Sequence, residues 1–279
     1  GREYALLAGE NPDVARAIYD HYLPVAAGGE LPQTDVGAIV GLADKIDTIV
    51  GFFGVGLPPS GTADPYALRR QALGVINILL DKRYPLNLHF LIDESLSLLK
   101  DVLKKPAEDV KKDVLDFFRG RLQNQLIGQG YAYDTVDAVL ASDIGDLVSV
   151  LEKIAALQAF RQNPEFEPIS IAFKRVDNIL KGYEGGRPDV NLLTAEAEIR
   201  LFSAFETIGE RVEKGIAEKN FPAALNNLAA LRPPVDAFFD TVMVMDKDEQ
   251  IRANRLSLLA EISTLFHKIA DFSKIVTAG

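Results

Sequence analysis

The 279-residue sequence contains no cysteine, no tryptophan and only three histidines. The lack of cysteine excludes disulfide bonds, thiolate metal sites and cysteine nucleophiles, and three scattered histidines leave little for a zinc site. Positively charged residues are also fewer than negatively charged ones. The sequence has 30 lysines and arginines against 40 aspartates and glutamates, which gives a net charge of −10. The chain therefore lacks the broad basic surface that drives non-specific nucleic-acid binding, and any such site must be local.

Long hydrophobic runs are missing as well. The longest apolar stretch, IVGFFGVGLPP at 49–59, is interrupted by glycine and proline. It is far shorter than the roughly 20 residues that a membrane helix needs. We therefore expect a soluble protein, and we assign it to the cytoplasm, whose reducing conditions suit a chain without cysteine. The first residues, GREYALLAGE, have neither an initiating methionine nor a signal pattern, so we expect a part of a longer protein.

Apolar residues recur at helical spacing almost throughout, whereas the alternation typical of strands is nearly absent. The sequence therefore predicts an all-α protein built as a multi-helix bundle. Asn11 before Pro12 and Asp64 before Pro65 are expected to start helices. The helix expected at 34–53 has an apolar stripe, predicted to be buried, that begins with Val36, Ile39 and Val40.

A helix expected at 169–181 separates into two faces. Its apolar residues gather on one side, and Lys174, Asn178 and Lys181 follow one another along the other side, with Arg175 at the edge of the apolar stripe. Two ammonium groups and an amide in one outward line suit contacts to phosphates and to an exposed base edge. An ordinary solvated helix face gives the same pattern, so spacing alone leaves both interpretations open.

The stretch VDAFFDTVMVMDKDEQIRANRL, residues 235–256, holds both methionines of the chain. If the helix continues to residue 245, Met245 lies on its core face, Met243 at the edge and Val244 away from the core. Met245 is then a core filler, and the other two leave apolar surface for a partner or for the adjoining helix.

The helix expected from 247 to 272 carries Arg255 on its apolar stripe. A charge in that position needs a partner. We expect Arg255 to form a structural ion pair with Asp236 or Asp240, whereas Arg252 and Asn254 are expected to be freer to meet a ligand.

Catalytic patterns are sparse. Asp44 and Asp47, with His21 upstream, are the only acids that we considered for metal or proton chemistry, and acids at this spacing on an amphipathic helix usually face solvent or cap a helix. The sequence shows no glycine-rich phosphate loop, no serine–histidine signature and no paired-histidine helix motif. A metal-dependent phosphohydrolase that uses Asp44 stays open as an alternative.

Seven segments, in order along the chain, carry a family resemblance: GREYALLAGE, ADKIDTIVGFFGVG, DPYALRRQALGVINIL, LQAFRQNPEF, FKRVDNILK, LRPPVDAFFDTVMVMDKDEQIRANRLSLL and IADFSKI. Together they resemble the bacterial glycyl-tRNA synthetase beta subunit. The resemblance covers almost the whole sequence and corresponds to the C-terminal two-fifths of that subunit. It implies the end of an HD-type domain followed by a helical anticodon-binding domain of the DALR type, which is also found in arginyl-tRNA synthetase.

The resemblance implies three regions: residues 1–105 as the end of the HD-type domain and following helices, 106–183 as a helical connection, and 184–279 as the DALR-like anticodon-binding bundle. Asp44 matches the late aspartate of HD motifs, whose histidine partners would lie upstream, so no complete metal site is expected here.

In this family an α2β2 assembly charges tRNA, and its alpha subunit carries the class II active site that uses ATP and Mg²⁺. The resemblance therefore implies a non-catalytic part of a glycine–tRNA ligase, without a cofactor of its own. Its expected partners are glycine tRNA and the alpha subunit, with neither membrane nor DNA. A helical scaffold that only docks proteins is the remaining alternative.

Helix geometry then selects the residues within this expectation that could contact the anticodon side of the tRNA. The predicted RNA-binding residues are Arg161, Lys174, Arg175, Asn178, Lys181, Arg252, Asn254 and Arg255.

Overall fold

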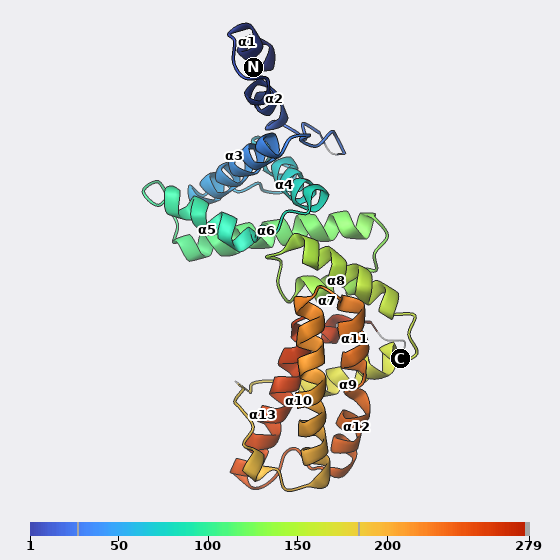
Figure 1. Ribbon diagram of the computed structural model, residues 1–279. Helices are drawn as coiled ribbons and strands as arrows, with labels where there is room; N and C mark the ends of the chain where they lie inside the picture. Colours follow the sequence, from blue (N-terminus) through green and yellow to red (C-terminus); the bar gives the residue numbers. More distant parts are fainter. Residues whose placement is uncertain (27, 184, 277–279) are drawn as a thin grey trace. The chain divides into compact units, whose positions relative to one another are not determined.

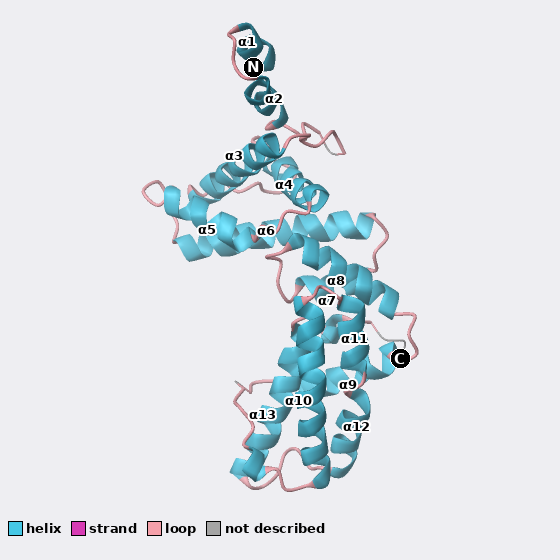
Figure 2. Ribbon diagram, in the orientation of Figure 1, coloured by secondary structure: helices cyan, strands magenta, loops and turns pink. Residues whose placement is uncertain are grey.

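A computed structural model of the protein describes residues 1–26, 28–183 and 185–276. Throughout that part of the chain the elements are helices joined by loops, as Figure 2 shows, and an isolated bridge pairs Ser60 with Ala63. The predicted all-α class is confirmed. None of the helices in the described ranges has the length and apolar character that crossing a membrane requires.

The chain forms two compact units. Unit 1 comprises Gly1–Gly128 and Ile144–Val148, and unit 2 comprises Gln129–Asp143 and the residues from Ser149 onward. The chain thus passes from one unit to the other more than once. The three regions expected from the sequence are drawn on different grounds from these units and stay a prediction.

Unit 1 is organised around one long helix, α3, which packs against α2, α4, α5 and α6 (Figure 1). The helices of unit 1 are α1 (Arg2–Leu7), α2 (Pro12–Asp20), α3 (Asp35–Gly54), α4 (Leu68–Lys82), α5 (Leu88–Leu98) and α6 (Ala107–Gly128).

Two of the expected helix starts illustrate how far local sequence fixes structure. Asn11 caps α2 as predicted, because its side chain accepts a backbone N–H at 2.7 Å. Asp64 also caps, accepting the N–H of Leu68 at 2.8 Å, but α4 begins at Leu68 and not at Pro65. The reason is that Ala67 has a left-handed backbone conformation (φ 56°), so the right-handed helix cannot extend back through it to Pro65.

Part of the predicted buried stripe of α3 is wrong. Gly37 and Gly41 are buried instead, and a Cβ atom on Gly37 would lie 2.3 Å from the Cβ atom of Asp20. A Cβ atom on Gly41 would lie 2.9 Å from the carbonyl oxygen of His21. Two positions of the packed face at this end of α3 therefore carry no side chain, which lets α2 approach closely, and Ala38 and Leu42 are buried beside them. The apolar residues that were predicted to be buried and are exposed are Val36, Ile39, Val40 and Ala43.

Asp20, the last residue of α2, is a buried carboxylate that joins α2 to the start of α3. Its oxygens accept the backbone N–H groups of Gln33 and Thr34 and the hydroxyl of Thr34, each at 3.0 Å, and the Nε–H of Arg16 at 2.8 Å. Burial acts to raise the pKa of Asp20, but the donors from Thr34 and Arg16 outweigh it, so the pKa lies below its usual value.

In unit 2, α10 packs against α11, α12 and α13, and α9 packs against α12 and α13 (Figure 1). The elements are α7 (Tyr133–Leu140), α8 (Leu147–Phe160, whose first two residues belong to unit 1), α9 (Phe166–Ile179), the short 3-10 helix η1 (Val190–Leu192), α10 (Glu196–Ala217), α11 (Phe221–Ala229), α12 (Arg232–Thr241), α13 (Glu249–His267) and the 3-10 helix η2 (Phe272–Lys274).

An aromatic cluster fixes α9 against the end of α13. The ring of Phe173 stacks on Phe266 with centroids 4.6 Å apart, and Phe272 meets both rings edge-on at 5.7 and 5.4 Å. All three side chains are buried. Aromatic pairs in these geometries stabilise a core beyond the area that they bury.

The beginning and the end of unit 2 are also bonded to each other. Asp271 donates its backbone N–H to the carbonyl oxygen of Ala138 at 2.8 Å, and Val276 donates its N–H to a carboxylate oxygen of Asp134 at 2.8 Å. Helix α7 is therefore held by residues that follow α13.

We predict that Asp20→Asn lowers the free energy of unfolding of unit 1 by about 2–3 kcal/mol at neutral pH, because hydrogen bonds to a charged acceptor are lost in a buried place. The folded-state pKa of Asp20 is depressed. Its contribution is therefore present above the unfolded-state value of about 3.9 and is lost as the pH falls toward the folded-state value.

Urea unfolding followed by circular dichroism, with hydrogen exchange to assign the loss to α2 and α3, measures this difference. The difference between wild type and Asp20→Asn should shrink below about pH 4. Asp81→Asn, at an exposed position of α4, is the control and should cost little. Equal losses in the two variants would contradict the role of Asp20.

Candidate nucleic-acid interface

Three of the predicted RNA-binding residues line one hollow of about 670 Å³ in unit 2. Lys174, Asn178 and Lys181 come from α9 and the turn that follows it, and the hollow also includes side chains from the end of α13 and from η2. Asn178 and Lys181 are exposed, and Lys174 is half-buried. The structure therefore brings these three groups together on one surface, as their spacing predicts.

Arg175, the neighbour of Lys174, is held by an aromatic ring. Its guanidinium carbon lies 4.2 Å from the ring centroid of Phe239 on α12, which is a close cation–π contact. The side chain remains exposed. This contact joins α9 to α12, and it gives Arg175 a structural task that the helix pattern does not reveal.

Arg161, just after α8, neutralises a buried carboxylate. Its Nη1 lies 2.9 Å from both oxygens of Asp134 and 3.1 Å from the hydroxyl of Thr135. Burial acts to raise the pKa of Asp134, but Arg161 and the N–H of Val276 outweigh it and hold the pKa below its usual value. Arg161 is therefore a partner of the core, and contact between Arg161 and RNA stays a prediction.

Arg255 is buried on the apolar stripe of α13 and forms structural ion pairs as predicted, but with carboxylates other than those predicted. Its Nε–H donates to Glu198 at the start of α10. Its Nη1 donates to Asp246 at 2.7 Å and to the carbonyl oxygen of Met243 at 2.8 Å. One guanidinium thus ties α13 to α10 and to the segment between α12 and α13.

The carboxylates proposed as partners of Arg255 are wrong. Asp236 instead accepts from Arg232 at 3.2 Å, and Asp240 is exposed. The reason is that α12 ends at Thr241 and the chain leaves the helix, with Val242 in an extended conformation (φ −116°, ψ 124°).

The helical register assumed for residues 242–245 is therefore wrong as well. Val242 and Val244 are buried, whereas Met243 and Met245 are 73% and 58% exposed. This is the two-residue alternation of an extended chain and not the 3.6-residue period of a helix. Met245 is consequently not a core filler, and Val244 does not point away from the core.

Glu198 receives more than the guanidinium. One of its oxygens accepts the backbone N–H groups of Thr194 and Ala195 at 2.7 and 2.9 Å, which caps the start of α10. Burial acts to raise the pKa of Glu198, but these N–H donors and Arg255 outweigh it and lower the pKa overall. The carboxylate is therefore charged and fully engaged within the fold.

Asn254 was expected to be freer than Arg255, and this expectation is wrong. The side chain is buried; its Oδ1 accepts the N–H of Asp189 at 2.6 Å and its Nδ2 donates to the carbonyl oxygen of Asp189 at 3.0 Å. Arg252 is more exposed but donates to the carbonyl oxygen of Asp246 at 2.8 Å and pairs with Glu249 at 3.4 Å. Asn254 closes the loop before α10 onto α13.

Asp44 and Asp47 line one hollow of unit 1, but in the part of the chain that the structure describes they form no grouping with His21 or with other acids that has metal-ligand spacing. Asp44 is exposed, Asp47 accepts from Ser95 at 3.3 Å, and the side chain of His21 lies 3.3 Å from a carbonyl oxygen of its own helix. Between them, Lys45 is buried and donates to the carbonyl oxygen of His21 at 2.7 Å. The lysine of the LADKID motif thus fastens α2 to α3, and within the described ranges the one grouping with metal-ligand spacing lies in unit 2.

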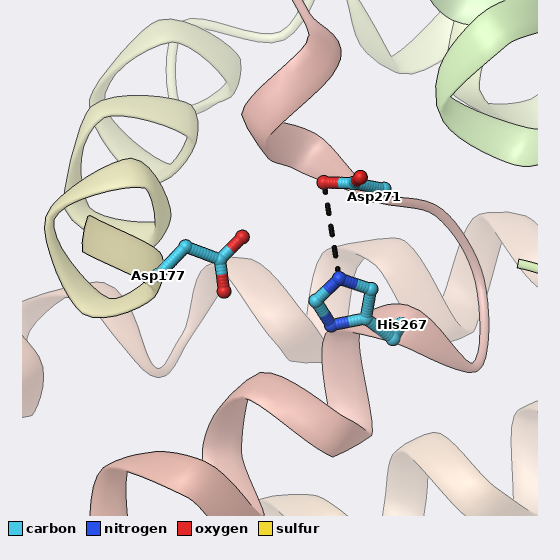
Figure 3. Close-up of side chains that lie close together, drawn as sticks. All are labelled: Asp177, His267 and Asp271. Atoms are coloured by element: carbon cyan, nitrogen blue, oxygen red, sulfur yellow. Dashed lines mark ion pairs between the residues drawn. The ribbon is translucent and has the colours of Figure 1, made fainter. Parts of the chain in front are cut away.

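That grouping consists of Asp177 on α9, His267 at the end of α13 and Asp271 just beyond it (Figure 3). Nε2 of His267 lies 3.8 Å from Oδ1 of Asp271. The sequence alone does not reveal this cluster, because 90 positions separate Asp177 from His267. The i, i+4 spacing of His267 and Asp271 was the only local signal.

Comparison with known families adds the decisive observation. The family described as glycyl-tRNA synthetase beta subunit matches residues 1–141, which is just over half of the chain. The chain belongs to the glycyl-tRNA synthetase beta subunit family. A second match, described as DALR anticodon binding domain, covers residues 169–277.

Curated relatives named glycine–tRNA ligase beta subunit agree with this membership. The protein of Syntrophus aciditrophicus is 60% identical over 277 residues, that of Geobacter metallireducens 54% over 275, and that of Syntrophotalea carbinolica 53% over 275. Each alignment covers 99% of this chain and 40% of the relative. The chain therefore spans about two-fifths of the length of these beta subunits, the share that the resemblance implied.

Within this beta-subunit family member, the DALR match includes the hollow residues Lys174, Asn178 and Lys181 and also Arg252, Asn254 and Arg255. Arg161 precedes it. Those six residues thus fall into two groups, those that line an accessible hollow and those that hold α13 in place, and Arg252 belongs with the second. Arg175, also within the match, belongs to neither group and joins α9 to α12.

We predict that Arg255→Gln lowers the free energy of unfolding by about 3–5 kcal/mol, because Glu198 is left buried without its cation. Denaturant unfolding followed by circular dichroism measures the loss. Arg200→Gln is the matched control, since Arg200 is an exposed α10 arginine paired with exposed Glu196, and it should cost less than about 1 kcal/mol. A small effect of Arg255→Gln would show that the buried pair does not hold the bundle.

Proposed function

We propose that this chain is the tRNA-recognition portion of a glycine–tRNA ligase beta subunit and that it binds the anticodon side of glycine tRNA. An alpha subunit supplies the aminoacylation chemistry with ATP and Mg²⁺. The observation that carries this proposal is the presence, in one chain, of the beta-subunit family match at 1–141 and the DALR anticodon-binding match at 169–277. Because the chain spans only 40% of its relatives, the activity of the whole enzyme is part of the proposal.

The hollow beside α9 is the place that suits RNA best. Lys174 and Lys181 supply ammonium groups for phosphate oxygens, and the exposed amide of Asn178 has the donors and the acceptor needed for a base edge. Anticodon bases are unstacked, so side chains can reach their edges. The net charge of −10 confines such contacts to a local surface of this kind.

Arg252, Asn254 and Arg255 have a different part in this proposal. Their polar groups are bonded to Asp246, Asp189 and Glu198, so they orient α13 and the loop before α10 and do not read bases themselves. Their contribution to RNA binding is therefore indirect, through the placement of α13 beside the hollow.

The test is fluorescence anisotropy with labelled glycine tRNA and with a control tRNA that carries a substituted anticodon, over a series of salt concentrations. We expect tighter, salt-dependent binding to the glycine anticodon. Neutralising Lys174 and Lys181 together should weaken binding, and the slope of log K against log salt should become shallower by about 0.7 for each phosphate contact that is lost.

The matched control for this test removes two exposed charges from α10, as Arg211→Gln and Lys214→Gln together. Binding that survives the neutralisation of Lys174 and Lys181 unchanged would refute the placement at the hollow. Equal binding to the two tRNAs would refute anticodon recognition by this chain, and no binding to either would favour a helical scaffold that docks proteins.

A further inference from the structure

We propose that Asp177, His267 and Asp271 form a binding site for a divalent transition-metal ion such as Zn²⁺ or Mn²⁺. One ligand atom from each of the three residues lies within 4.8 Å of the other two. Two ligands of one tetrahedral zinc ion, each about 2.1 Å from it, lie about 3.4 Å apart. The ligand atoms therefore need to approach one another by up to about 1.4 Å, which requires changes in the side-chain torsions at this half-buried surface.

The imidazole of His267 is held in the form that a metal requires. Its Nδ1 lies 2.9 Å from the carbonyl oxygen of Ser263, and because a carbonyl only accepts, Nδ1 carries the proton of this bond. In the neutral ring Nε2 then keeps its lone pair, and it is Nε2 that faces Asp271 in Figure 3. Histidines that bind metals usually donate their other N–H to such an acceptor, which fixes the tautomer.

Both carboxylates are oriented by neighbours. The hydroxyl of Ser263 donates to Oδ1 of Asp177 at 2.8 Å, and the backbone N–H and hydroxyl of Ser273 donate to Oδ1 of Asp271 at 3.0 and 2.5 Å. In both carboxylates these bonds engage Oδ1, which in Asp271 is also the oxygen 3.8 Å from Nε2 of His267. Oδ2 of each carboxylate is left for a metal ion, and in Asp271 a rotation of the carboxylate is needed to turn Oδ2 toward His267.

The electrostatics of the cluster favour a cation. Asp177 and Asp271 are both half-buried, and a carboxylate oxygen of one lies within 4.8 Å of a carboxylate oxygen of the other. Two carboxylates in a partly desolvated place repel each other. An ion of charge +2 between them removes this repulsion, as a neutral water cannot.

The ligand atoms indicate the class of metal. One imidazole nitrogen and two carboxylate oxygens suit Zn²⁺ and Mn²⁺, whereas Ca²⁺ and Mg²⁺ prefer oxygen alone and the softest ions prefer thiolates. Three protein ligands leave coordination positions for water, and the hollow that Lys174 and Lys181 line gives access to them. The site goes beyond the proposed RNA binding and does not depend on it.

Isothermal titration calorimetry of the chelator-treated protein with Zn²⁺, and separately with Mn²⁺, tests the site without RNA. We expect one ion per chain and a rise in melting temperature on binding. His267→Gln and Asp271→Asn should each abolish the binding, and Ser263→Ala should weaken it about tenfold by freeing Asp177. His89→Gln and Asp240→Asn, in other parts of the chain, are the matched controls and should bind as wild type does.

Titration with Co²⁺ gives a readout that needs only the wild-type protein. Co²⁺ bound by imidazole and carboxylate ligands should show an absorption band in the visible range. Added Zn²⁺ should displace the Co²⁺ and remove this band. Absence of stoichiometric binding in the wild type would overturn the proposal. So would binding that His267→Gln leaves unchanged, and the three residues would then be an ion-paired network only.

Discussion

The buried guanidinium of Arg255 is the interaction on which the arrangement of unit 2 depends. A charge in that place is tolerated only with partners, since the loss of one partner of a buried pair costs several kcal/mol. Its partners come from the start of α10 and from the segment after α12, at Glu198 and Asp246. These elements must therefore meet at one point of α13, and Asn254 adds the loop at Asp189 to the same point. Arg255 and Asn254, which the sequence suggested as RNA contacts, thus hold in place the helix α13 that borders the hollow.

The fold class and part of the helix starts were predictable because they depend on neighbours in sequence. Periodicity identified the helices, and Asn11 caps α2 as expected, whereas Asp64 accepts the first N–H groups of a helix that begins at Leu68 and not at Pro65. Burial along a helix was less predictable, because it depends on what packs there. At α3 the close approach of α2 buries Gly37 and Gly41, so large side chains such as Val36 remain outside. Helix α12 ends at Thr241, although the apolar residues that follow give no sign of this. At 242–245 burial therefore alternates every two residues and does not follow the 3.6-residue period of a helix.

Around the hollow, too, some residues could be placed from the sequence and others could not. Lys174, Asn178 and Lys181 lie within eight positions of one another, so helix geometry alone places them together. Asp177 meets His267 only because the ring of Phe173 stacks on Phe266 and draws α9 against the end of α13. The polar cluster is a product of an apolar contact four residues away on one helix and one residue away on the other. No spacing rule for ligands contains that information.

The bonds that hold α7 have a consequence for the order in which unit 2 is completed during translation. Helix α7 belongs to the first part of this unit to leave the ribosome, yet the N–H groups that bond Asp134 and Ala138 belong to Val276 and Asp271. More than 130 residues must be synthesised between donor and acceptor. Until then, the carboxylate of Asp134 has Arg161 as its earliest long-range partner. Helix α7, the first helix of the unit, can therefore reach its final set of hydrogen bonds only after the residues that follow α13 have been synthesised.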